Sequence, residues 1–119
     1  MSSSTPKGPY KLITVNDAPE RAKKVIGRVV DDLKDQYTID YLANCISKDE
    51  VELKVKEYKP DILFCASMWT IEESTEMQEI AKSIVPDIKT YAIPYGLQVK
   101  EGPDAIVEHL KEQIPLLLG

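Results

Sequence analysis

The chain has 119 residues, of which 20 are acidic and 15 are Lys or Arg, and its formal net charge is −5 at pH 7. Charged residues make up 29% and hydrophobic residues 43%, a balance that is typical of a folded domain and excludes a disordered or fibrous class. The longest apolar run, residues 62–68, is far shorter than the roughly 20 residues that cross a bilayer. No cluster of basic and aromatic residues is present, so neither a membrane nor a nucleic acid is an expected partner.

The N-terminal segment, residues 1–8, is rich in Ser and lacks the apolar core of a secretory signal. We interpret it as a flexible leader that precedes one α/β domain over residues 9–119. A chain without a secretory signal is expected in the cytoplasm. In that reducing compartment its two cysteines, Cys45 and Cys65, are expected to be free thiols.

Strand-like and helix-like segments alternate four times along the chain. Strands are predicted at residues 10–15, 37–45, 62–66 and 87–93. Helices are predicted to begin at residues 17, 47, 70 and 103, with a loop over residues 94–102 and an end to the last helix before Pro115. The first three helix starts match a capping box, a pattern in which a small polar residue and a Glu three positions later bond the first amides: Asp17 with Glu20, Ser47 with Glu50 and Thr70 with Glu73.

Strands that are joined by helices run parallel, because the connections are too long for hairpins. The fold expected from this alternation is a three-layer, flavodoxin-like α/β sandwich of four parallel strands in the order 2-1-3-4. Its centre is the stretch Lys59–Thr70, where a continuously apolar strand ends in small polar residues.

A ligand site is predicted at the carboxyl edge of this sheet, because open α/β sheets bind ligands where the strand order reverses. For the order 2-1-3-4 that crevice lies between the first and third strands. The candidate ligand-binding residues are Asn16, Asp17, Arg21, Ser67, Met68, Trp69 and Thr70, with Tyr95, Gly96 and Gln98 able to close the crevice. A small anionic or polar ligand suits this set, although Asp17, Ser47 and Thr70 are also residue types that commonly cap helices without any ligand.

The sequence lacks the residues that several kinds of chemistry require. Neither glycine-rich phosphate-binding motif occurs, which makes nucleotide hydrolysis improbable. The only histidine, His109, stands among charged residues on what reads as a solvated helix face, so we expect no metal site, no catalytic triad and no cofactor. A catalytic role stays open only for Asp17 and for Cys45, whose pKa a nearby helix N-terminus could lower.

The chain resembles the IIB domains of the sugar phosphotransferase system, of the galactitol or lactose/cellobiose type. The similarity lies in Asp40 to Ser67 and in Ile93-Pro94-Tyr95-Gly96, followed by Gly102 and a terminal helix. It implies four parallel strands and phosphoryl transfer through a cysteine after the first strand. That place holds Val15-Asn16-Asp17-Ala18-Pro19, so the phosphocysteine is lost.

Two other flavodoxin-like families look similar. Residues Lys59–Thr70 resemble the third strand and following helix of cobalamin-binding domains, although the D-x-H-x-x-G element that ligates cobalt is absent. Residues 10–96 resemble the substrate-side domain of D-2-hydroxyacid dehydrogenases. A likeness to response-regulator receiver domains ends at Ala66 or Ser67, where their phosphorylated Asp would stand.

The function that these observations favour is a non-catalytic small-ligand or protein-binding module derived from a IIB-like fold. One alternative is an enzyme or phosphoryl carrier that uses Cys45 or Asp17 at the carboxyl edge. The other is an assembly subunit that forms a homo-oligomer through the last helix, where Leu116, Leu117 and Leu118 would otherwise be exposed.

Overall fold

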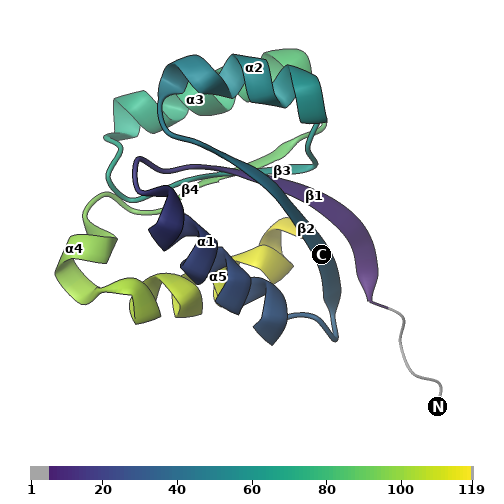
Figure 1. Ribbon diagram of the computed structural model, residues 1–119, viewed down its shortest axis with the longest axis vertical. Coiled ribbons are helices and arrows are strands. Elements are labelled where there is room, and N and C mark those ends of the chain that lie inside the picture. The colour runs from purple at the N-terminus through teal and green to yellow at the C-terminus, as the bar shows by residue number, and fades with distance from the viewer. Residues whose placement is uncertain (1–5, 119) are drawn as a thin grey trace.

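The computed structural model describes residues 6–118 and shows one parallel sheet between two layers of helices (Figure 1). The strands are β1 (Lys7–Val15), β2 (Tyr37–Cys45), β3 (Ile62–Cys65) and β4 (Lys89–Ala92), in the order β2-β1-β3-β4. All three strand pairs are parallel. The predicted flavodoxin-like fold and its strand order are therefore confirmed.

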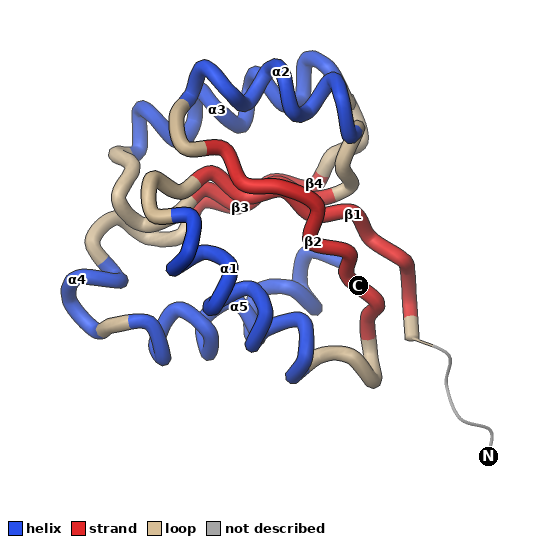
Figure 2. Tube along the Cα trace, in the orientation of Figure 1, coloured by secondary structure: helices blue, strands red, loops and turns tan. Residues whose placement is uncertain are grey.

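Within residues 6–118, five helices flank the sheet: α1 (Pro19–Asp32), α2 (Lys48–Tyr58), α3 (Ile71–Ile84), α4 (Leu97–Glu101) and α5 (Pro103–Leu118). Figure 2 shows α2 and α3 together on one face, and α1 and α5 on the other with α4 at its edge. No helix within residues 6–118 has the length and apolar content needed to cross a bilayer.

The alternation of side chains along β1 builds two separate cores. Leu12 points into the core shared with α1 and α5, whereas its neighbours Ile13 and Val15 point into the core shared with α2 and α3. The side chains of the central strand β3 alternate in the same way, with Phe64 on the α1 side and Cys65 on the α3 side. Burial on both faces explains why this strand reads as a continuous apolar run.

The pairing of β1 with β2 contains an irregularity at Leu42. Leu12 pairs with Tyr41 and Ile13 pairs with Ala43, so Leu42 is an extra residue in β2. Tyr41 and Asn44 therefore both lie beside Thr14 of β1, to which their side chains are hydrogen-bonded, although a regular strand would place them on opposite faces.

The first strand begins earlier than predicted. β1 starts at Lys7, within the range assigned to a flexible leader, and residues 1–5 of that range lie outside the described part of the chain. Gly8 has φ +119°, and a Cβ added there would lie 2.5 Å from the carbonyl oxygen of Thr38. A close approach of two strands, which the sequence pattern does not reveal, fixes this end of β1.

Three further predictions near the C-terminus are wrong. The expected loop over residues 94–102 contains α4, and α5 continues through Pro115 to Leu118 instead of ending before the proline. Leu117 and Leu118 consequently pack against the core, and only Leu116 is exposed. His109 is also not on a solvated face: its Nε2 lies 2.6 Å from the hydroxyl of Tyr91, and the two rings pack together.

Only one of the three predicted capping boxes forms in full. Thr70 and Glu73 cap α3 reciprocally. At α2 the Glu50 carboxylate accepts from the Ile46 amide, and the Ser47 side chain bonds no first-turn amide. At α1 the cap residue is Ala18, not Asp17, because Asn16 turns the chain first.

Candidate functional site

A narrow crevice opens at the carboxyl edge of the sheet, where β1 and β3 part and α1, α4 and α5 close around them. Its volume of about 30 Å³ holds one or two water molecules and no larger ligand. The floor is apolar and comes from both strands and both long helices, while the mouth is polar. The lining consists of Thr14, Asn16, Arg21, Ala22, Val25, Ile26, Phe64, Ala66, Ser67, Met68, Ile93, Gln98, Ile106 and Leu110.

Four of the predicted binding residues meet at this crevice, namely Asn16, Arg21, Ser67 and Met68, and the closing residue Gln98 joins them. They come from the ends of β1 and β3, from the first turn of α1 and from α4. Parallel strands bring these segments to one edge, as the predicted strand order requires.

Asn16 and Ser67 already have structural partners. The Asn16 side-chain oxygen accepts from the Ala18 amide at 2.7 Å, a turn that directs the chain into α1. Ser67 ties down the segment after β4: its carbonyl accepts from the Gly96 amide at 2.9 Å, and its hydroxyl accepts from the Gln98 amide at 3.2 Å. Gly96 has φ +83°, a conformation that favours glycine. Both residues shape the crevice whether or not a ligand binds.

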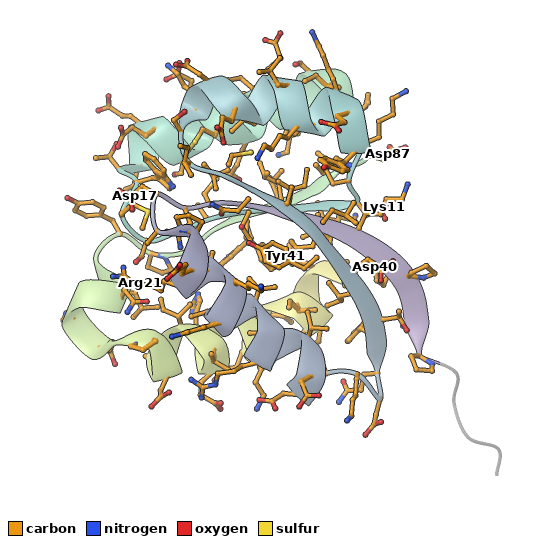
Figure 3. All side chains as sticks on the ribbon, viewed as in Figure 1. Lys11, Asp17, Arg21, Asp40, Tyr41 and Asp87 are labelled. Atoms are coloured by element: carbon orange, nitrogen blue, oxygen red, sulfur yellow. The ribbon has the colours of Figure 1, made fainter. Side chains whose placement is uncertain are left out.

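The other predicted residues do not line the crevice. Trp69 packs into the core beneath α2 and α3, where its indole N–H donates to the Val15 carbonyl at 2.8 Å. Thr70 caps α3 on that same side. Asp17 is exposed at the tip of the loop after β1 (Figure 3), and Tyr95 is exposed in the loop after β4.

A buried polar network beside the crevice was not predicted. The Thr14 hydroxyl donates to the Asn44 side-chain oxygen at 2.6 Å and accepts from the Tyr41 hydroxyl at 2.6 Å. The Asn44 amide group in turn donates to the Asn16 carbonyl at 2.9 Å. Burial raises the pKa of Tyr41, so its hydroxyl stays protonated as a donor. The one signal in the sequence is Thr14, a polar residue within an apolar strand.

The structure rules out the cysteine chemistry that the sequence left open. Cys45 and Cys65 are both fully buried, and burial raises their pKa values to about 11 and about 12. Both pair with Val15, from opposite sides, which puts them two strand spacings or about 10 Å apart. A disulfide needs Cα atoms within about 7 Å, so the thiols are free, as expected. Cys45 is therefore not an activated nucleophile.

Among residues 6–118, no three His, Cys, Asp or Glu side chains come close enough together to hold a metal ion. The loop after β1 offers Asn16 and Asp17 but no histidine, and His109 is engaged with Tyr91 on the edge strand β4.

Three exposed apolar side chains lie at the carboxyl edge of the sheet. Ile46, Ile71 and Tyr95 follow β2, β3 and β4 respectively, and their exposed fractions are 50%, 78% and 67%. Because all three segments leave the sheet at the same edge, these side chains belong to one end of the molecule. We call this set of three the apolar rim.

Comparison with known proteins finds no family model that matches the chain. The chain is 35% identical over 89 residues to the anaerobic magnesium-protoporphyrin IX monomethyl ester cyclase of Rubrivivax gelatinosus. The match covers 67% of this chain and 16% of the cyclase. The chain thus corresponds to a small part of that larger protein.

Among solved structures, the chain is similar to the receiver domain of AraT, a response regulator from Geobacillus stearothermophilus, with a TM-score of 0.60, 11% identity and coverage of 92% of this chain and 98% of that one. For the receiver domain of the putative response regulator NarL from Mycobacterium tuberculosis, the TM-score is 0.52 and the identity is 9%, with coverage of 72% of this chain and 64% of that one. For the MID domain of the Argonaute protein QDE-2 from N. crassa, the TM-score is 0.59 and the identity is 12%, with coverage of 92% of this chain and 99% of that one. At these identities the likeness shows a shared flavodoxin-like fold alone.

Proposed function

We propose that this chain is a non-catalytic ligand-binding module for a planar, largely apolar ring system with carboxylate or amide groups at its periphery, the class to which tetrapyrroles belong. The observation that carries the proposal is the apolar rim, which lies at the carboxyl edge of the sheet, where open α/β sheets bind ligands and where the crevice also opens. We propose that the ring lies across the rim and that only a small group or tail of the ligand enters the crevice, whose volume of about 30 Å³ excludes the ring itself.

The rim supports a flat apolar ligand on energetic grounds. Exposed Ile and Tyr side chains gain about 25 cal/mol for each Å² of apolar surface that a ligand covers. Trp69, half-buried beneath the same edge and held by Val15, gives this end of the molecule a rigid support. Arg21 and Gln98 at the mouth of the crevice can bond peripheral carboxylate or amide groups.

One comparison and one resemblance in the sequence support the same class. The cyclase to which the chain is similar is named for a magnesium tetrapyrrole. Separately, Lys59–Thr70 resembles the third strand and following helix of cobalamin-binding domains, and cobalamin is also a tetrapyrrole derivative. Because the loop after β1 has no histidine, we propose that the ring is held by its face and periphery and receives no metal ligand from that loop.

The test is an absorbance titration of the protein with hydroxocobalamin and with magnesium protoporphyrin IX. Wild-type protein is expected to bind one of them with a dissociation constant in the micromolar range, and Ile71→Asp or Tyr95→Asp is expected to weaken binding at least tenfold. Leu53→Asp is the matched control, because Leu53 is 68% exposed on α2 away from the carboxyl edge. Absence of binding by wild-type protein, or equal loss in the control, would contradict the proposal.

Two related proposals use the same fold. Descent from a IIB-like domain, without the phosphocysteine, is compatible with a binding role but predicts sugar phosphates as ligands, which the same titration can include. A protein domain seated on the apolar rim would be the alternative occupant.

We further propose that the module works in the cytoplasm, where its buried thiols stay reduced.

A further inference from the structure

A second hollow lies next to the crevice, in the groove between α1 and the beginning of α5. The groove has a volume of about 430 Å³, enough for a small organic group. It is lined by Glu20, Arg21, Lys24, Val25, Arg28 and Pro103. The two helices pack closely along their length, so the walls of the groove are held by the core and do not depend on loops.

The groove and the crevice share a wall. Arg21 and Val25 line both hollows, from one face of α1. A ligand whose apolar part lies at the crevice can therefore extend a substituent past Arg21 into the groove. Figure 3 shows Arg21 on the first turns of α1, at the end of the molecule that carries Asp17.

The cations of the groove are not equivalent. Arg28 is held by Asp104 at 2.6 Å, and its charge is thereby compensated. Arg21 and Lys24 have no ion-pair or hydrogen-bond partner for their side chains among residues 6–118, and their spacing of three puts them on the same helix face. Among the described residues that line the groove, Glu20 is the one carboxylate, and it forms no ion pair within residues 6–118. The groove is thus net positive in a chain whose net charge is −5.

We propose that Arg21 and Lys24 form an anion subsite that binds a carboxylate or phosphate group of the ligand held at the carboxyl edge. This proposal rests on the proposed function and adds the recognition of an anionic substituent to it. The positive end of the α1 dipole favours the same charge near Arg21, which stands in the first turn of the helix. An arginine offers a fork of two donors to a carboxylate or phosphate, and a lysine adds a point charge.

The first experiment compares deuteroporphyrin IX with its dimethyl ester, which lacks the two carboxylates. The variant Arg21→Gln/Lys24→Gln is expected to bind the diacid about 5- to 20-fold more weakly than wild type does and the ester equally well. Lys23→Gln is the control, because Lys23 is an exposed cation of α1 that does not line the groove. Equal weakening of diacid and ester, or weakening in the control, would overturn the subsite.

The second experiment tests the subsite even if no macrocycle binds. Isotope-labelled protein is titrated with inorganic phosphate and, separately, with acetate, while amide chemical shifts are followed. Shifts are expected to be confined to the first two turns of α1 and the start of α5, to weaken with added chloride and to vanish in Arg21→Gln/Lys24→Gln but not in Lys23→Gln. The stronger of the two anions identifies the chemical group. Shifts that are absent, or that survive in the double variant, would refute the subsite, whereas loss of macrocycle binding alone would refute the proposed function.

Discussion

Thr14 is the residue on which the polar contacts behind the crevice depend. Its single hydroxyl group accepts from Tyr41, donates to Asn44 and so connects β2 to the loop that carries Asn16. Each member of this chain of hydrogen bonds is at least half-buried, where an unpaired polar group costs more than the bond itself contributes. The network fixes the position of Asn16 without contacting a ligand.

Removing the Thr14 hydroxyl should destabilise the fold more than removing that of Tyr41. Thr14→Val leaves two partners without their bond and is expected to lower the free energy of unfolding by about 2–3 kcal/mol, whereas Tyr41→Phe leaves one and should cost about 1 kcal/mol. Urea denaturation measures both. Tyr58→Phe is the control, because the Tyr58 hydroxyl has no hydrogen bond among the described residues. Equal effects of Thr14→Val and Tyr58→Phe would contradict the role of the network.

The candidate site shows which residues a sequence can and cannot assign to a crevice. Asn16, Arg21, Ser67 and Met68 follow from the strand order, because the ends of adjacent parallel strands must meet. The position of Trp69 could not be predicted, because a shift of one residue along the chain moves a side chain to the opposite face of the sheet. In the structure Trp69 lies on the α3 side. Tyr41 and Asn44 depend on the extra residue Leu42, which no local pattern marks.

At the scale of the secondary-structure elements, two glycines have opposite roles. Gly8 in β1 has a positive φ and lies against the backbone of β2, so it has no room for a side chain. Gly27 stands within α1, where an added Cβ would meet nothing within 4 Å. The first glycine is required by the geometry of its element, and the second weakens its helix.

Alanine substitutions at these two positions should therefore change stability in opposite directions. Gly8→Ala is expected to lower the free energy of unfolding by about 1–3 kcal/mol through backbone strain and the contact with the Thr38 carbonyl. Gly27→Ala should raise it by about 0.5–1 kcal/mol, since alanine is the better helix former. Chemical denaturation of the two variants serves as a mutual control. A neutral Gly8→Ala would show that residues 7–8 behave as the predicted leader and not as part of β1.

Helix ends were the least predictable feature of the elements. The pattern of Asp17 and Glu20 matches a capping box, but Asn16 accepts from the Ala18 amide first and moves the cap residue to Ala18. In α5, Pro115 stands inside the helix although proline usually ends one, because Leu117 and Leu118 gain burial by continuing it. Tertiary packing outweighs the local signal in both cases.

At the scale of the whole molecule, hydrophobic periodicity was sufficient to predict the sheet. Strand and helix patterns alternate, which predicts parallel strands, and the continuously apolar third strand was expected inside the sheet; the proposed order 2-1-3-4 is confirmed. The short helix α4 escaped prediction because five residues between two glycines carry too little periodicity. Cys45 shows the same limit, since its depth in the core follows from the assembled sheet, whereas Cys65 lies within the central apolar run, which by itself predicts a buried thiol.

The buried thiols lead to a prediction about the stability of the whole molecule at alkaline pH. Burial raises the pKa values of Cys45 and Cys65 from 9.0 to about 11 and about 12. The unfolded chain, whose thiols ionise near their ordinary value, therefore releases protons first as the pH rises. The stability that these thiols contribute is fully present below about pH 9 and is lost as the pH rises toward their folded pKa values.

The free energy of unfolding should consequently fall by an amount on the order of 4 kcal/mol between pH 8 and pH 11, beyond the contribution of tyrosines and lysines. Urea denaturation at a series of pH values measures this slope. Cys45→Ala/Cys65→Ala is expected to be less stable at pH 8, because two buried side chains are shortened, but to show a flatter decline above pH 9. The comparison rests on the slope and not on the absolute stability. An identical dependence of the free energy of unfolding on pH in the variant would mean that the thiols are not buried in the core beneath α2 and α3.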